Sequence, residues 1–166
     1  MTDRLSRLLA ARPYLLADGA MGTNLFMRGL TSGDAPEPWN IDQPARVAEV
    51  HRGFAAAGSD ILLTNTFGAN RQRLKLHKLE HRVEELNAAG ARLAREAADA
   101  SGREIAVAGS IGPTGDLLQP LGPLTQDEAR EVFAEQARGL KAGGADVLWI
   151  ETMSAADELE AAVSGA

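Results

Sequence analysis

Residues 143–154, GGADVLWIETMS, decide the fold because they place a helix end, a short apolar run and an acid in one stretch. The four apolar residues from Val147 to Ile150 lead directly into Glu151 without any polar alternation. Such runs are typical of strands buried on both faces, as in a parallel sheet. Because a buried, unpaired carboxylate is costly, the stretch predicts a strand that delivers an acid to a site at its end.

Three more apolar runs lie upstream, at Tyr14 to Ala17, Ile61 to Leu63 and Ile105 to Ala108. The four runs begin 47, 44 and 42 residues apart, at positions 14, 61, 105 and 147. AGSDILLTNT at 57–66 also resembles GGADVLWIET at 143–152, with glycine, aspartate, leucine and threonine at matching places. The resemblance indicates that one supersecondary unit is used twice.

Helical periodicity fills the first two gaps between the runs. Apolar residues recur at steps of three and four over 47–57 and again over 83–97. Pro44 supplies a start for the first helix and Gly58 a stop, while Gly102 ends the second. Each gap therefore holds one predicted helix.

Two capping-box matches mark later helix starts. TQDE at 125–128 predicts a helix that closes at Gly143-Gly144, and Ser154 with Asp157 predicts another helix near the end of the sequence. Strand and helix thus alternate four times, which favours an α/β fold with parallel strands.

This alternation is compatible with two architectures, a doubly wound sheet and a (β/α)8 barrel. No G-x-G-x-x-G follows a strand, so the phosphate loop of a dinucleotide fold is missing. Four units of about 44 residues make half of a barrel of roughly 350 residues. The prediction is an α/β fold forming the N-terminal half of a (β/α)8 TIM barrel, with residues 1–166 as a single partial domain truncated after the fourth strand.

Composition excludes several functional classes. The chain has 166 residues, 45% of them hydrophobic, and a net charge of −6, as in ordinary globular domains. The acidic balance offers no basic patch to nucleic acid, and no apolar run approaches the roughly 18 to 20 residues of a membrane span. The N-terminus lacks the apolar core of a secretory signal, so the cytoplasm is the expected location. The sequence contains no cysteine, which excludes disulfides and cysteine-based metal sites in it.

HKLEH at 77–81 matches the H-x-x-E-H pattern of a class of zinc proteases. The surrounding RQRLKLHKLEHR is crowded with cations, which repel a metal ion, and it is typical of a solvated face. No metal site is therefore predicted there.

The candidate substrate-binding residues are polar groups at the carboxyl ends of the strands, where α/β enzymes place their sites. Five of them are Asp18, Asn65, Thr66, Ser110 and Glu151. The carboxylates of Asp18 and Glu151 would converge on one pocket, where they suit an ammonium group or general acid–base work. The alternative is that each acid only caps a helix or pairs with an arginine.

Trp39, in the proline-bearing loop DAPEPWNID, is the sixth candidate substrate-binding residue. An aromatic ring in such a loop can close over a substrate and attract a quaternary ammonium group. The alternative is a hydrophobic plug at the edge of the barrel.

Four segments, DGAMGTNL, AGSDILLTNTFGAN, VAGSIGPTG and GGADVLWIET, resemble in order and spacing the homocysteine S-methyltransferase family. That family includes betaine–homocysteine methyltransferase and the homocysteine-binding module of cobalamin-dependent methionine synthase. The resemblance runs from about Leu15 to the last residues. It implies a (β/α)8 barrel that transfers a methyl group from betaine or a similar donor to the homocysteine thiolate, giving methionine.

The resemblance also implies roles for particular residues. Asp18 and Glu151 would hold the amino group of homocysteine, and Trp39 matches a tryptophan that contacts betaine in the animal enzymes. Gly68, in TNTFGAN, stands where those enzymes carry a betaine-contacting tyrosine. S-methylmethionine and a corrinoid-bound methyl group are therefore rival donors.

Family members hold zinc through three cysteines, and the zinc binds homocysteine as a thiolate. This sequence has none of those cysteines. The resemblance thus implies the substrate-amine half of a methyltransferase, inactive alone, with self-association or a complementing C-terminal half as its partner. The alternative is a non-catalytic remnant or a half-barrel module that binds an amino acid or a partner chain. A metal-free lyase is weaker, because no lysine ends any of the four runs.

Overall fold

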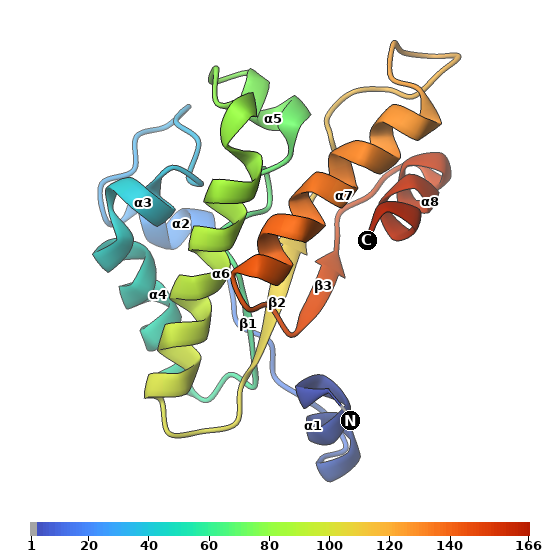
Figure 1. Cartoon of the computed structure of the whole chain (residues 1–166). Helices are drawn as coiled ribbons and strands as arrows, with labels where there is room; N and C mark the ends of the chain where they lie inside the picture. The colour runs from blue at the N-terminus through green and yellow to red at the C-terminus, as the bar shows by residue number, and fades with distance from the viewer. Residues whose placement is uncertain (1–2) are drawn as a thin grey trace.

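The computed structural model describes residues 3–166 and shows a parallel three-stranded sheet with helices packed on it (Figure 1). The strands are β1 (Ile61–Leu63), β2 (Ala106–Ile111) and β3 (Val147–Ile150), in this order across the sheet. Both neighbouring pairs are parallel, which confirms the predicted α/β class.

The strand predicted at residues 14–17 is wrong as a strand, because the segment makes only one isolated parallel bridge, from Ala17 to Ile61. The Leu16 N–H is donated to a carboxylate oxygen of Asp60 at 3.1 Å instead of to a backbone carbonyl. The Leu16 carbonyl accepts the N–H groups of both Asp60 and Ile61. A side chain therefore replaces part of the ladder, and the segment lies along the free edge of β1 without extending the sheet.

Strand β2 is longer than its apolar run predicts and contains Ser110 instead of ending before it. The register sets Ser110 opposite Trp149 and Ile111 opposite Ile150. The Glu151 N–H then donates to the Ile111 carbonyl at 3.0 Å. This register brings the side chains of Ser110 and Glu151 together at the carboxyl end of the sheet.

Three long helices, α4 (Pro44–Ala57), α6 (Val83–Ala100) and α7 (Gln126–Ala142), lie side by side against the sheet, and α8 (Ala156–Gly165) packs on α7 (Figure 1). The shorter helices are α1 (Arg4–Ala11), α2 (Met21–Phe26), α3 (Trp39–Asp42), α5 (Arg71–Lys75) and the 3-10 helix η1 (Glu80–Arg82). Over residues 3–166, no helix has both the length and the apolar character needed to cross a bilayer.

The predicted helix boundaries hold where local chemistry sets them. The capping box of α7 is present, with the Thr125 hydroxyl accepting the Glu128 N–H and the Glu128 carboxylate accepting the Thr125 N–H. Gly58 ends α4 at a φ of +109°, a left-handed conformation that glycine adopts without strain. The box predicted from Ser154 and Asp157 is wrong, because α8 starts after Ala155 and Asp157 accepts the N–H of its neighbour Glu158.

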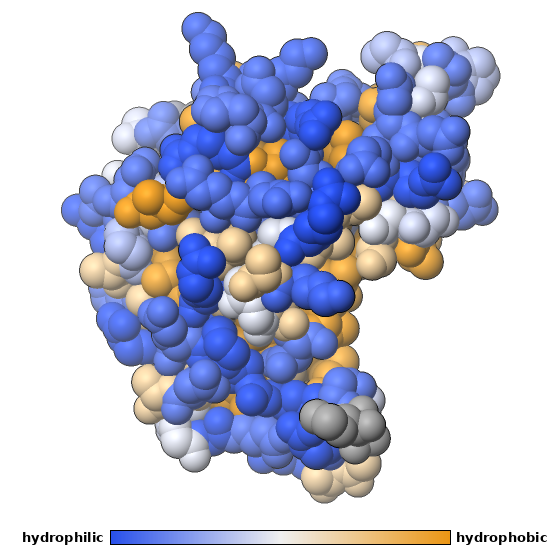
Figure 2. Space-filling model, viewed as in Figure 1, coloured by the Kyte–Doolittle hydropathy of each residue, from blue (hydrophilic) through white to orange (hydrophobic). Residues whose placement is uncertain are grey.

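The core lies mainly between the sheet and the long helices. Leu62 and Val107 pack on the alanines of α6, and Ile111 packs on Phe133 and Leu140 of α7. The other face of the sheet meets Leu8 of α1. All four residues of β3 are only half-buried, and Figure 2 shows a hollow with hydrophobic surface along that side, between α8 and α1.

Candidate functional site

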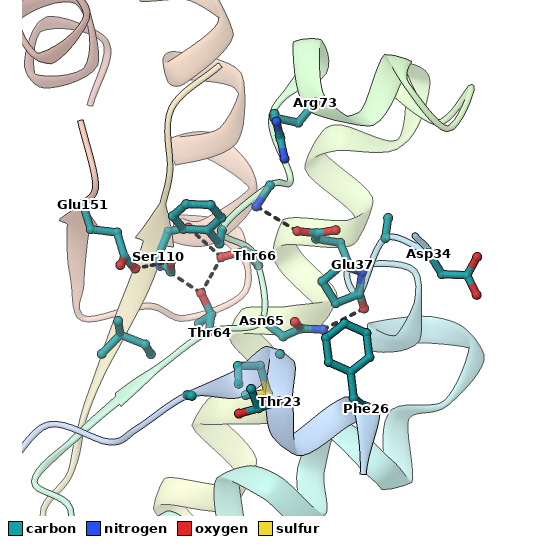
Figure 3. A pocket seen from close by; sticks show the side chains of 18 of the residues that line it. Thr23, Phe26, Asp34, Glu37, Thr64, Asn65, Thr66, Arg73, Ser110 and Glu151 are labelled. Atoms are coloured by element: carbon teal, nitrogen blue, oxygen red, sulfur yellow. Dashed lines mark hydrogen bonds between the residues drawn. The ribbon is translucent and has the colours of Figure 1, made fainter. Parts of the chain in front are cut away.

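A cavity of about 820 Å³ opens at the carboxyl ends of the strands (Figure 3). Its inner end is formed by Asp18, Ser110 and Glu151, and its outer end by Glu37, Arg73 and His77. The position agrees with the rule that open and closed α/β sheets bind ligands beyond the carboxyl ends of their strands. Of the six residues predicted from sequence, five line this cavity: Asp18, Asn65, Thr66, Ser110 and Glu151.

Asp18 follows the bridge to β1 and is fixed by backbone groups. Its N–H donates to the Ile61 carbonyl at 3.0 Å, and its carboxylate accepts the Leu63 N–H at 3.0 Å. Burial, opposed by the Leu63 hydrogen bond and assisted by the Glu151 charge, raises the pKa of Asp18 to about 7. A cation bound here would relieve the cost of ionising Asp18.

Glu151 extends from the end of β3 toward the same inner end. Its carboxylate accepts a hydrogen bond of 2.6 Å from the Ser110 hydroxyl. The next residue, Thr152, has a φ of +61°, which is uncommon for a β-branched residue and carries strain. The strained residue therefore directly follows Glu151 at the carboxyl end of β3.

A closed ring of hydrogen bonds fixes Ser110. Its N–H donates to the Thr64 hydroxyl at 3.0 Å, and its carbonyl accepts the Thr66 hydroxyl at 2.8 Å. The two threonine hydroxyl oxygens are 2.5 Å apart. Since the Thr66 proton is already donated to Ser110, Thr64 must be the donor between them. Each buried hydroxyl donates once and accepts once, and the ring aims the Ser110 side chain at Glu151.

Asn65 lines the cavity, but its amide is used within the fold. Its NH₂ group donates to the Pro36 carbonyl at 2.9 Å and to the Asn40 side chain at 3.0 Å. The Asn40 amide returns a bond to the Asn65 carbonyl at 2.8 Å. Asn65 therefore ties the loop after β1 to α3, and a contact with substrate stays a prediction.

Trp39 is the one predicted site residue that the structure does not bring to the cavity. It begins α3 and packs on a cluster that includes Leu25 and Val47, with the Arg46 guanidinium 5.2 Å from its ring centroid. This is the arrangement of a hydrophobic plug at the edge of the fold. A contact between Trp39 and a methyl donor stays a prediction.

Sequence reasoning missed the outer end of the cavity. The Glu37 carboxylate accepts the Gly68 N–H at 2.8 Å, and a Cβ on Gly68 would lie only 2.8 Å from that carboxylate oxygen. Burial raises the pKa of Glu37 against its hydrogen bonds and the charges of His77 and Arg73. No short-range pattern marks these residues, because they come from two separate loops and from α5. Thr64 carried a weak signal, since it directly follows the apolar run from Ile61 to Leu63, where polar residues at a strand end begin.

The residues present do not form a zinc site. Within the described range 3–166, no three histidine, aspartate or glutamate side chains group closely enough to hold a metal ion, and the sequence has no cysteine. The two histidines of HKLEH lie on a turn and in η1.

Comparisons with known proteins agree with this fold. The homocysteine S-methyltransferase family matches residues 15–166. The methionine synthases of Mycobacterium tuberculosis and Mycobacterium leprae are 36% and 35% identical over 173 aligned positions, which cover 99% of this chain and 14% of each synthase.

The homocysteine methyltransferase MmuM from Escherichia coli gives TM-scores of 0.82 in its metallated form and 0.84 in its oxidized form, each at 27% identity. These matches cover 96% of this chain and 60% of MmuM. The chain thus spans only part of the length of the relatives it matches. The sequence match over residues 15–166 and the shared fold lead to one conclusion: the chain belongs to the homocysteine S-methyltransferase family.

Proposed function

We propose that this chain binds the amino group of homocysteine for a homocysteine S-methyltransferase, which methylates the homocysteine sulfur to give methionine. The observation that carries the proposal is the convergence of two carboxylates, Asp18 and Glu151, at the inner end of one cavity. The homocysteine ammonium group would lie between them and lower the free energy of the charged form of Asp18.

In the proposed reaction, the homocysteine thiolate sulfur forms a bond to the donor's methyl carbon. The bond from that carbon to the donor's nitrogen, sulfur or cobalt breaks, and its electron pair stays with the leaving donor. The thiol proton passes to solvent water before the attack. The residues of this chain contribute binding and orientation. Asp18 and Glu151 hold the amine, and the ring of hydrogen bonds through Thr64 and Thr66 keeps Ser110 bonded to Glu151. Betaine is the leading donor, with S-methylmethionine and a corrinoid-bound methyl group as rivals.

We also propose that the sheet is the amino-terminal half of a (β/α)8 barrel. The 60% coverage of MmuM and the half-buried edge strand β3 support this. An uncovered strand edge pairs readily with another strand, so a complementing segment or a second copy would lie against β3. Zinc, which the family resemblance implies, would then be held by residues outside this sequence.

A second candidate is a non-catalytic module that binds an amino acid. The observation in its favour is the lack of any cysteine to present a thiolate-binding metal. The two candidates share the amine site and differ in methyl transfer. Product formation by this chain, alone or with a complementing half, separates them.

The amine site can be tested directly by homocysteine titration of the chain followed by calorimetry. Glu151→Gln is expected to raise the Kd more than ~10-fold, a loss of about 1.4 kcal/mol. Glu158→Gln is the matched control, because Glu158 also accepts a 2.6 Å hydroxyl hydrogen bond, from Thr114, but does not line the cavity. Unchanged affinity in the Glu151 variant would remove this residue from the site.

A further inference from the structure

The outer end of the cavity carries a cation that the fold does not use. Arg73 extends from α5 toward the cavity (Figure 3), and its guanidinium group makes no hydrogen bond or ion pair with any residue from 3 to 166. Arg71, two residues earlier, instead pairs with Glu135 of α7 at 3.0 Å. His77 follows Arg73 by four residues and lines the same cavity.

The acids near Arg73 do not neutralise it by direct contact. Glu37 is buried and gives a carboxylate oxygen to the Gly68 N–H, and burial disfavours its charged form. Asp34 also lines the cavity, but its side chain points away from Arg73 in Figure 3. A free guanidinium group with a planar set of donors is suited to a carboxylate, which it can bind through two parallel hydrogen bonds.

The cavity is therefore polarised along its length. The inner end holds the carboxylates of Asp18 and Glu151, and the outer end holds the Arg73 guanidinium group near Glu37, whose charged form burial disfavours. Its volume of about 820 Å³ lies in the upper part of the range for small-molecule sites, which leaves room for two small ligands. A zwitterion entering beside homocysteine would align with its cationic end inward and its acidic end outward.

We infer that Arg73 and His77 form a carboxylate-binding subsite that takes the acidic end of a small zwitterionic methyl donor. This inference rests on the proposed function and narrows the donor class to molecules that carry an onium-bound methyl group and a carboxylate. The alignment would direct the methyl-bearing cation toward the inner end, where the homocysteine sulfur is proposed to lie. Betaine and S-methylmethionine share this chemistry, whereas a corrinoid-bound methyl group does not.

The test is titration of the 166-residue chain, saturated with homocysteine, with betaine and in a second arm with S-methylmethionine. Arg73→Gln is expected to raise the Kd of the bound zwitterion at least ~10-fold. Arg73→Lys keeps the positive charge but lacks the planar set of donors, so its Kd for the zwitterion should lie between those of the wild type and Arg73→Gln. Arg52→Gln is the matched control, since Arg52 is exposed on α4 outside the cavity and also makes no hydrogen bond or ion pair within residues 3–166. Its affinity for the zwitterion should equal that of the wild type.

Titration with choline tests the role of the carboxylate, because choline keeps the trimethylammonium group of betaine and lacks the carboxylate. It should bind at least ~10-fold more weakly than betaine and equally to the wild type and Arg73→Gln. Equal affinity of the wild type and Arg73→Gln for the zwitterion would overturn the inference. So would a wild-type chain that binds neither betaine nor S-methylmethionine. Failure of homocysteine itself to bind would instead refute the proposed function, so the two failures are distinguishable.

Discussion

The two similar segments of the sequence, 57–66 and 143–152, have matching roles where their strands begin. Asp60 accepts the Leu16 N–H and pairs with Arg12 and Arg103. Asp146 accepts the Val107 N–H and pairs with Arg95, both at 2.8 Å. Each aspartate therefore joins the start of its own strand to the neighbouring segment, residues 14–17 for Asp60 and β2 for Asp146, through a side-chain bond to the backbone.

The same segments differ where their strands end. Asn65 and Glu151 occupy the same position in the repeated segment. The Asn65 side-chain amide donates both of its hydrogen bonds to groups of the fold. The Glu151 carboxylate lines the cavity and accepts one hydrogen bond, from Ser110. Thr66 is buried in the hydroxyl ring, whereas Thr152 is exposed and left-handed. The repeated unit thus carries a structural aspartate at the amino end of each strand and a cavity-lining residue at the carboxyl end.

The largest expected effect on the free energy of unfolding comes from the aspartates at the amino ends of β1 and β3. Asp60→Ala should lower the free energy of unfolding by about 3 kcal/mol, because it leaves two arginines and a backbone N–H without their buried partner. Asp146→Ala should cost about 1.5 kcal/mol, since Asp146 is more exposed. Urea denaturation measures both, with the exposed Asp127→Ala as the control. Equal stabilities of all three variants would break the comparison.

The next effect concerns the hydroxyl ring. Thr64→Val should cost about 2 kcal/mol of stability by leaving buried groups unpaired, and it should also weaken homocysteine binding because Ser110 is no longer fixed. Thr64→Ser keeps the hydroxyl and should restore the affinity. Thr114→Val removes an equally buried hydroxyl bonded to Glu158 and should lower stability without changing the affinity. Wild-type affinity in Thr64→Val would refute the positioning role.

The pH dependence of stability tests Asp18. Its folded pKa of about 7 lies above the ordinary 3.8, so the folded state holds the proton more tightly. The resulting stabilisation is complete below about pH 4 and is lost as the pH rises through 7. Asp18→Asn should remove this dependence, a difference on the order of 1.5 kcal/mol between pH 5 and pH 8 after allowance for partial solvent contact. Parallel pH profiles for the two proteins would show that Asp18 is not desolvated.

The smallest effect is expected at Thr152. Thr152→Gly should raise the free energy of unfolding by about 0.5 kcal/mol, because relief of the left-handed strain slightly exceeds the entropy cost of glycine. Thr66→Gly should have the opposite sign, since it removes a ring member. Thermal denaturation compares the two, and a loss of stability in both would contradict the assignment of strain to Thr152.

Sequence patterns predicted the elements whose boundaries depend on local chemistry. The Thr125–Glu128 box and Gly58 set their helix ends without help from the rest of the fold. The segment at 14–17 differs because a distant carboxylate, Asp60, takes one of its ladder hydrogen bonds. Apolar composition cannot reveal that competition.

The candidate site was predictable to the same extent. The rule that strand ends meet at one edge was enough to bring Asp18, Ser110 and Glu151 to the inner end. Glu37 and Arg73 lie near each other only because the loop before α3 and helix α5 both border the cavity. No spacing along the sequence encodes this proximity. The position of Trp39 outside the cavity has a related cause, because its ring packs on Arg46 and on the cluster that includes Val47 of α4.

The half-buried edge strand gives the molecule an optical reporter. The sequence has two tryptophans, and Trp149 lies on β3 while Trp39 packs beside α4. In a Trp39→Phe variant, fluorescence would come from Trp149 alone. A polypeptide that covers β3 would exclude water from the indole and shift its emission to shorter wavelength, so the completion of the sheet could be followed as a spectral change in real time.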